Sequence, residues 1–279
     1  MKLLIYIMDI EYKLTREMLR RGYSERTIKT YLECINRFFR KTKKDPVKIS
    51  KIEVKEFLNN LKSKNAAGNT INVYLNALKF FFEEVLNKKM RLNIKYSKAP
   101  KRLPVVLTKD EIKRLISSIE NSKHKLMIKL MYSAGLRVSE LVNLKNEDLN
   151  FENNYGWVRG GKGNKDRIFI LAESIKEELQ EYLKNKKINN WLFPGNKRNH
   201  LSQRTVAAIV KDASRKARIN KKVHTHTLRH SFATHLIEND YAITDVQNLL
   251  GHNSPETTMV YLHTASKNMI KVKSPLDSL

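Results

Sequence analysis

The stretch His224-Thr225-His226-Thr227-Leu228-Arg229-His230-Ser231-Phe232-Ala233-Thr234-His235-Leu236 gathers more reactive side chains than any other part of the chain. Its apolar residues recur every three or four positions, which predicts an amphipathic helix. His226 and Arg229 lie three positions apart and therefore project from neighbouring points on one helical face. An imidazole beside a permanent planar cation suits a site that handles phosphate.

A second group of signals follows this stretch. Gly251 indicates the end of a helix and places His252 directly after it. Ser254 and Pro255 are typical of an N-cap and a first helical residue, so a new helix is expected there. That helix carries Tyr261 on its second turn.

A third signal lies upstream, in Gly135-Leu136-Arg137-Val138-Ser139-Glu140-Leu141. The glycine ends an apolar helix, and Arg137 is expected at the turn that leads into a short helix.

Strand character appears between residues 149 and 171. The segments 155–159 and 166–171 flank a glycine-rich turn and predict an antiparallel hairpin. Lys162 lies between two glycines at its tip, where the backbone has the freedom to deliver a side chain to a ligand. Lys165 is the second candidate at this tip and the better candidate for a phosphate contact.

The order of these motifs resembles the tyrosine recombinases of the phage integrase family, and the Xer chromosome-dimer resolvases most of all. The resemblance rests on His-x-Leu-Arg-His-Ser-Phe-Ala-Thr-His-Leu, then Leu-Gly-His, then a tyrosine nine residues later. It implies an enzyme that breaks and rejoins DNA through a 3′-phosphotyrosyl intermediate. The implied catalytic residues are Arg137, Lys162, His226, Arg229, His252 and the nucleophile Tyr261, with Glu140 in a supporting role.

These residue types fit the chemistry. A covalent ester on tyrosine keeps the energy of the broken phosphodiester, so rejoining needs no cofactor. Two arginines can hold the phosphate oxygens as negative charge develops on them. We expect a lysine to protonate the departing 5′-oxygen, His226 to accept the tyrosine proton or hold the phosphate, and His252 to add a hydrogen bond. No metal ion is expected, since the cations are side chains.

Composition agrees with a polyanionic partner. The 279 residues carry 54 Lys and Arg against 28 Asp and Glu, a formal charge of +26. Double-stranded DNA is the expected partner, and an anionic membrane surface is the alternative. The single cysteine, Cys34, excludes a disulfide framework and is expected to be buried. No apolar run is long enough to span a bilayer, so we expect a cytoplasmic, nucleoid-associated protein.

The expected fold is mainly α, in two domains. Residues 1–94 predict a helical bundle resembling the family's SAM-like core-binding domain, with helix starts at Ser24, Ser50 and Gly68. Residues 95–107 predict a basic linker. Residues 108–279 predict an α+β catalytic domain with a small antiparallel hairpin or sheet and a C-terminal tail.

Basic residues predict where DNA is bound. In the N-terminal domain they are Arg20, Arg21, Arg26, Lys29, Lys41, Lys43 and Lys44. A helix from Ser202 to about Ala217 carries Arg204, Lys211 and Arg215 and is a candidate for the major groove. By resemblance, the C-terminal tail docks on a neighbouring protomer in a tetramer on DNA; the alternative is a frayed terminus.

Four other functions compete with this one. A mobile-element integrase uses the same chemistry, and a type IB topoisomerase uses the same residue set. A non-catalytic DNA-binding module disagrees with the complete set of site residues. A metallonuclease with His224, His226, His230 and His235 as ligands is disfavoured, because the stretch lacks carboxylates before Glu238.

Overall fold

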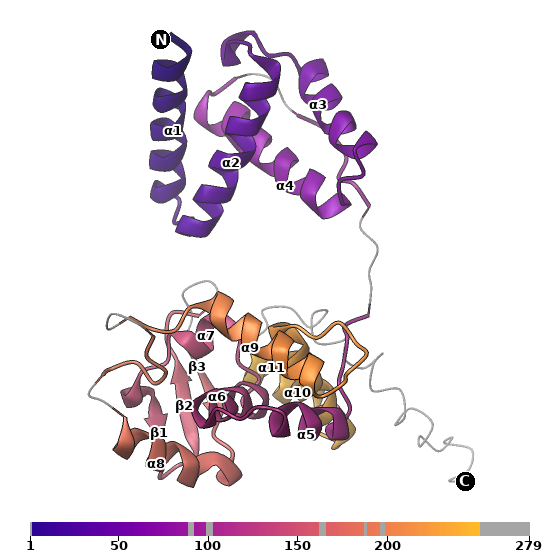
Figure 1. Ribbon diagram of the computed structural model, residues 1–279. Coiled ribbons are helices and arrows are strands. Elements are labelled where there is room, and N and C mark those ends of the chain that lie inside the picture. Colours follow the sequence, from indigo (N-terminus) through magenta and orange to yellow (C-terminus); the bar gives the residue numbers. More distant parts are fainter. Residues whose placement is uncertain are drawn as a thin grey trace, which may run out of the picture. The chain divides into compact units, whose positions relative to one another are not determined.

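The computed structural model describes residues 2–88, 92–98, 103–161, 166–186, 189–195 and 199–251, with side chains from Asp9 onward. The chain divides into two compact units, Met1–Lys101 and Arg102–Leu279 (Figure 1). This division lies inside the basic segment 95–107. None of the described helices combines the length and the hydropathy that a membrane span requires.

The N-terminal unit is a helical bundle. Helix α2 packs against α1 and α4, and α3 packs against α4. Side-chain caps start two helices where the sequence predicts them: Ser24 Oγ accepts from the backbone N of Thr27, and Ser50 forms a capping box with Glu53. The elements are α1 (Lys2–Arg20), α2 (Glu25–Thr42), η1 (Pro46–Lys48), α3 (Lys51–Ser63), α4 (Gly68–Lys79) and η2 (Phe80–Val85).

Phenylalanines fill the centre of this unit. The Phe38 ring lies edge-on to Phe57 at a centroid distance of 5.0 Å, and Phe39 contacts Phe81 at 5.5 Å. Such pairs add about 0.5–1.5 kcal/mol each beyond the burial of their area. Cys34 is 5% exposed, which confirms its expected burial.

The chain beyond α4 continues as a wider turn and not as an α-helix. Residues Phe80–Val85 form a π-helical turn, in which Phe80, Phe81 and Phe82 are all buried. Three consecutive side chains span too much of an α-helix to share one face, and the wider turn accommodates them.

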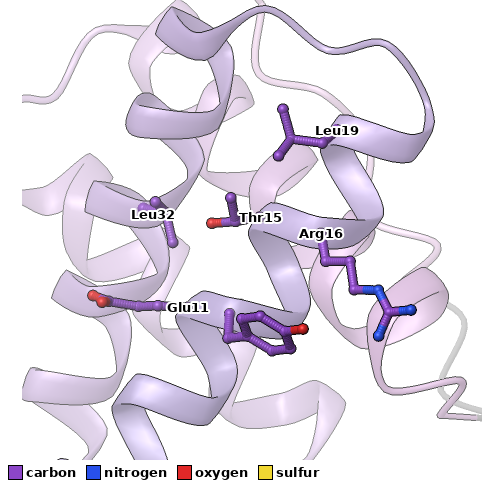
Figure 2. A pocket seen from close by; sticks show the side chains of 6 residues that line it. Glu11, Thr15, Arg16, Leu19 and Leu32 are labelled. Atoms are coloured by element: carbon purple, nitrogen blue, oxygen red, sulfur yellow. The ribbon is translucent and has the colours of Figure 1, made fainter.

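A surface hollow lies between α1 and α2 (Figure 2). It is lined by Glu11, Tyr12, Thr15, Arg16, Leu19 and Leu32. None of the predicted site residues lines it.

The C-terminal unit combines helices with a small sheet. Thr108 and Glu111 form a capping box ahead of α5. Helix α10 packs against α6, α9 and α11, and α11 packs against β3. The elements are α5 (Lys109–Ser117), α6 (Ser122–Ser133), α7 (Val138–Val142), η3 (Asn146–Asp148), β1 (Leu149–Asn150), β2 (Tyr155–Val158), β3 (Arg167–Ile170), η4 (Glu173–Ile175), α8 (Lys176–Asn185), α9 (Gln203–Lys216), α10 (Thr225–Glu238) and α11 (Ile243–Leu250).

The sheet has the order β1-β2-β3 and is antiparallel throughout. Tyr155 pairs with Ile170, and Val158 pairs with Arg167, which confirms the predicted hairpin. The short strand β1 extends it to three strands. The expected fold class is therefore confirmed: mainly helical, with an N-terminal bundle and a small antiparallel sheet.

Candidate active site

Helix α10 presents two of the predicted site residues on its first turns. His224 is its N-cap, and the helix runs over Thr225–Glu238. The His226 side chain is exposed, whereas Arg229, three residues later, is only 3% exposed. The same end of the helix therefore offers one group to solvent and buries a charge close to it.

The turn before α7 is held to α10. Gly135 has a φ of +58°, and a Cβ at this position would lie 2.4 Å from a ring carbon of Phe232 on α10. Glycine meets both the left-handed backbone and the close approach. The Gly135 carbonyl accepts a hydrogen bond from Arg229 Nη1 at 2.7 Å. Arg137 follows as the N-cap of α7, at the turn where it is predicted.

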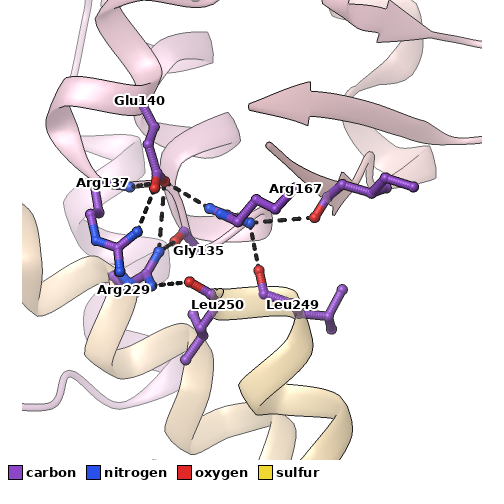
Figure 3. Close-up of polar contacts among 8 residues, drawn as sticks. Gly135, Arg137, Glu140, Arg167, Arg229, Leu249 and Leu250 are labelled. Atoms are coloured by element: carbon purple, nitrogen blue, oxygen red, sulfur yellow. Dashed lines mark hydrogen bonds and ion pairs between the residues drawn. The ribbon is translucent and has the colours of Figure 1, made fainter. Parts of the chain in front are cut away.

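Glu140 lies at the centre of the cluster (Figure 3). Its side chain is 3% exposed. It accepts hydrogen bonds from the Arg137 backbone N at 2.8 Å, from Arg137 Nη1 at 2.6 Å and from Arg167 Nη2 at 2.7 Å. Arg229 Nη1 lies 3.7 Å from the same carboxylate. One carboxylate thus faces three guanidiniums, which leaves the cluster with a net positive charge.

The carboxyl end of α11 closes the cluster. The Leu249 carbonyl accepts from Arg167 Nη1, and the Leu250 carbonyl accepts from Arg229 Nη2 (Figure 3). The last carbonyls of a helix carry partial negative charge and attract cations. Gly251 then ends α11 with a φ of +61°, as the sequence predicts. The chain therefore leaves α11 beside two arginines.

Glu140 is held in its ionised form. Burial by itself raises the pKa of this carboxyl, but the charge and hydrogen bond of Arg167, the Arg137 backbone N–H and the charge of Arg229 together lower it below the ordinary value. An ionised Glu140 keeps its donors in fixed directions, since a carboxylate accepts at both oxygens. The arginines are thereby oriented before any ligand binds.

His226 is held in its neutral form. Partial desolvation and the charges of Arg229 and Arg137 lower its pKa. A neutral imidazole can accept a proton near neutral pH. Deeper in the helix, burial and the neighbouring His226 and Arg229 lower the pKa of His230 to about 4.

Four of the predicted residues, Lys162, Lys165, His252 and Tyr261, lie outside the described residues. The structure does bring Arg137 and Glu140, which are neighbours at the start of α7, together with Arg229 from the distant helix α10. It places His226 at the same end of α10.

Helix α9 carries the remaining predicted residues. Arg204, Lys211 and Arg215 are all exposed, and their spacing puts them on one face of the helix. Arg215 Nη2 donates to Asp212 at 2.6 Å. The basic residues named for the N-terminal unit are also exposed; among them, Arg20, Arg21 and Lys44 form ion pairs with glutamates.

Sequence reasoning missed Arg167. It lies on β3, and its side chain is 9% exposed and bonded to both Glu140 and Leu249. Its neighbour Ile168 is 45% exposed, so an arginine takes the inward position that apolar patterning assigns to an isoleucine. The sequence gives no sign of this inversion, because the alternation Arg-Ile-Phe-Ile is equally compatible with the isoleucines facing inward.

One of the α10 histidines has a hydroxyl as its partner. His235 Nδ1 is 2.8 Å from the Tyr132 hydroxyl. Across the part of the chain that the structure describes, no three His, Cys, Asp or Glu residues are grouped so that they could hold a metal ion.

A helical unit that gathers arginines around one ionised glutamate at the end of a small sheet is suited to bind a phosphodiester, and this defines a protein that processes nucleic acid. The phage integrase family profile matches residues 105–268. The profile of the phage integrase N-terminal SAM-like domain matches residues 12–92.

Individual relatives agree with these matches. The tyrosine recombinase XerA of Pyrococcus horikoshii is 39% identical over 257 residues, which cover 89% of this chain and 86% of that protein. The putative integrase/recombinase y4qK of Sinorhizobium fredii is 31% identical, over 97% of this chain and 89% of that protein. A crystal structure of the XerH site-specific recombinase bound to palindromic difH substrate, a post-cleavage complex, is 26% identical with a TM-score of 0.73, over 90% of this chain and 80% of that chain.

The chain therefore belongs to the phage integrase family of tyrosine recombinases, which cleave and rejoin DNA. This confirms the resemblance drawn from the His224–Leu236 stretch.

Proposed function

We propose that this chain is a site-specific recombinase of Xer type, which acts at a dif-like site in DNA and resolves dimers of a circular chromosome. The Tyr261 phenol oxygen attacks the phosphorus of one strand and forms a 3′-phosphotyrosyl ester. The bond to the 5′-oxygen breaks, and that oxygen leaves as a hydroxyl. Attack by a 5′-hydroxyl from a second duplex reverses the step and frees the tyrosine.

One observation carries this proposal: Arg137 and Arg229 converge on the buried, ionised Glu140. Both guanidiniums are fixed in direction before DNA binds, and the cluster has a net positive charge. Such preorganised cations stabilise the negative charge that develops on the phosphate oxygens in the transition state. Arg137 is 19% exposed, so it has access to a bound strand.

The other roles follow from chemistry and chain position. His226, neutral and exposed on the first turn of α10, accepts the phenol proton. Lys162 protonates the departing 5′-oxygen, and His252 donates a hydrogen bond to a phosphate oxygen. Glu140 orients the two arginines and does not touch the substrate.

DNA binding involves both units. The face of α9 with Arg204, Lys211 and Arg215 contacts the duplex, together with Lys165 and the exposed basic residues of the N-terminal unit. Strand exchange joins two duplexes, so we infer a tetramer on DNA in which each C-terminal tail docks on a neighbour. The protein acts on the chromosome, in the cytoplasm, with the nucleoid.

Relatives support the Xer assignment over the alternatives. Archaeal XerA is 39% identical, and the XerH complex contains difH DNA. Integration into a host genome by a mobile element is the second candidate, because y4qK is described as a putative integrase/recombinase. Mapping of covalent adducts on genomic DNA separates the two: a single chromosomal site supports Xer, and adducts at the ends of a mobile element support an integrase.

The experiment that tests the chemistry uses a nicked duplex from the mapped site, in which the cleaved strand loses its short 5′-terminated fragment and the enzyme stays attached. Wild-type protein is expected to form a covalent adduct without added divalent ions. Tyr261→Phe is expected to bind the duplex and form none. An adduct that persists in Tyr261→Phe contradicts the proposed nucleophile, and the absence of any wild-type adduct contradicts the function.

A further inference from the structure

Arg167 lies where three elements of the candidate active site meet. From β3, its Nη2 donates to Glu140 at 2.7 Å and its Nη1 donates to the Leu249 carbonyl at the end of α11 (Figure 3). Its side chain is 9% exposed. Its Nε is buried without a hydrogen-bond partner in the part of the chain described here. A buried donor left unpaired costs stability, so this placement is not the best one for the fold alone.

We propose that Arg167 is a positioning residue for DNA cleavage: it occupies the carboxylate of Glu140 and the end of α11, and so keeps Arg137 and Arg229 directed at the phosphate. This inference rests on the proposed function and deepens it. Arg167 acts through Glu140 and does not itself contact DNA.

The physical basis of this role is that several donors compete for one oxygen of the Glu140 carboxylate. Glu140 Oε2 accepts from the Arg137 backbone N and from Arg167, while Arg229 Nη1 lies 3.7 Å from it. If the Arg167 charge is removed, Arg229 is the nearest buried cation that can replace it, and an unpaired buried charge draws a partner strongly. Arg229 would then turn toward Glu140 and away from its carbonyl partners at Gly135 and Leu250.

The end of α11 is the second point of control. A Cβ on Gly251 would lie 2.8 Å from Arg167 Cδ, so the arginine passes directly against the glycine that ends the helix. Arg167 and Arg229 bind consecutive carbonyls there, at Leu249 and Leu250. The chain that continues to His252 and Tyr261 therefore starts from a point fixed by both arginines.

The test measures single-turnover adduct formation on the nicked duplex, and DNA affinity by fluorescence anisotropy. Arg167→Met is expected to slow adduct formation by about 100-fold, the scale of a misplacement near 1 Å, with DNA affinity unchanged. Arg167→Lys is expected to form the adduct at a rate between those of wild type and Arg167→Met. Its single ammonium group cannot bind both Glu140 and the Leu249 carbonyl as the forked guanidinium does. The control is Arg114→Met, which removes an arginine that donates to the Ala217 carbonyl at the end of α9, away from the site. It is expected to cleave like wild type.

A double variant separates positioning from mere support of the fold. In Arg167→Met the Glu140 carboxylate loses one of its three guanidinium neighbours and pulls Arg229 toward it. Adding Glu140→Gln weakens that pull and is expected to recover the rate by roughly tenfold. If Arg167 only supports the fold, the two defects add and DNA affinity falls with them. That additive result, or a wild-type rate in Arg167→Met, overturns the proposal.

A modified substrate identifies the group through which Arg167 acts. A sulfur in place of the bridging 5′-oxygen leaves without a proton, so it bypasses a lysine acid. Arg167→Met is expected to remain slow on this substrate, because its defect lies in the arginines. A restored rate would assign Arg167 to the hairpin of Lys162 instead. Failure of the wild type to form an adduct on either substrate counts against the proposed function, not against this role.

Discussion

Two glutamates, one in each unit, each accept side-chain hydrogen bonds from two arginines. On α1, Glu17 accepts from Arg20 at 2.6 and 2.9 Å and from Arg21 at 2.7 Å. On α7, Glu140 accepts from Arg137 and Arg167 at similar distances. The chemistry is the same, but the Glu17 side chain is 21% exposed and the Glu140 side chain 3%.

The difference in burial gives the two clusters different effects on stability. The Glu17 cluster is local and hydrated, and hydrogen bonds from Arg20 and Arg21 lower its pKa to about 2. Surface pairs of this kind contribute little to stability. Glu140 instead draws partners from β3 and α10 into the interior, where a charge is costly unless it is paired. Every buried charged side chain among the described residues lies in the C-terminal unit. The unit that buries charged side chains is therefore also the unit that contains the candidate active site.

Truncation of these two glutamates gives the largest expected difference. Glu140→Ala leaves Arg167 and Arg229 buried without their carboxylate, and we expect the C-terminal unit to lose about 3–5 kcal/mol of unfolding free energy. DNA cleavage should be lost as well. Both tryptophans, Trp157 and Trp191, lie in this unit, so urea unfolding followed by tryptophan fluorescence reports on it.

Glu17→Ala is the matched control. Arg20 returns to water and Arg21 keeps its ion pair with Glu84, so the tryptophan transition and the cleavage rate are expected to stay at wild-type values. If both variants shift the transition equally, burial is not what distinguishes the two clusters.

The parts of the fold that the sequence predicts well depend on local interactions. The helix caps at Ser24 and Ser50 link residues three apart, and both are present. The left-handed Gly135 and Gly251 were expected as helix ends because a glycine there is a local signal. Arg137, His226 and Arg229 were identified by motif spacing, which also depends on near neighbours.

What the sequence concealed depends on distant partners. Arg167 and Glu140 lie 27 positions apart, and the sequence around either residue contains no signal that predicts their contact. The π-helical turn at Phe80–Val85 is coupled to the backbone N of Leu92, which donates to Glu83 at 2.6 Å. Both features arise from tertiary packing, which overrides local preference.

Two helix-ending glycines sharpen the comparison at a smaller scale. Gly22 after α1 and Gly251 after α11 have φ values of +71° and +61°. A Cβ at Gly22 would meet nothing within 4 Å, whereas at Gly251 it would lie 2.8 Å from Arg167 Cδ. Gly22→Ala is therefore expected to cost only the left-handed backbone, about 1 kcal/mol. Gly251→Ala should cost more and also slow cleavage, because Arg167 must move.

Cleavage rates decide this pair, since thermal shifts alone do not separate backbone strain from a displaced arginine. Gly251→Ala is expected to slow adduct formation with DNA affinity unchanged, while Gly22→Ala cleaves normally. Equal cleavage rates in the two variants would mean that the close approach of Arg167 to Gly251 has no role in the site.

The smallest expected effect is a difference between the two units in how their stability depends on acid pH. Burial, His226 and Arg229 lower the pKa of His230 from 6.5 to about 4, so between these values the unfolded chain binds a proton that the folded unit does not. The stability of the C-terminal unit therefore falls as the pH falls from 6.5 toward 4.

In the N-terminal unit, Glu17 and Glu53 have pKa values lowered from 4.5 to about 2. Their contribution to the stability of that unit is lost only as the pH falls from 4.5 toward 2. His230→Asn is expected to flatten the upper part of the tryptophan-monitored profile, but not completely, because the pKa values of His226 and His235 are lowered as well. A profile as steep in His230→Asn as in wild type would exclude the buried imidazole as a source of the acid sensitivity.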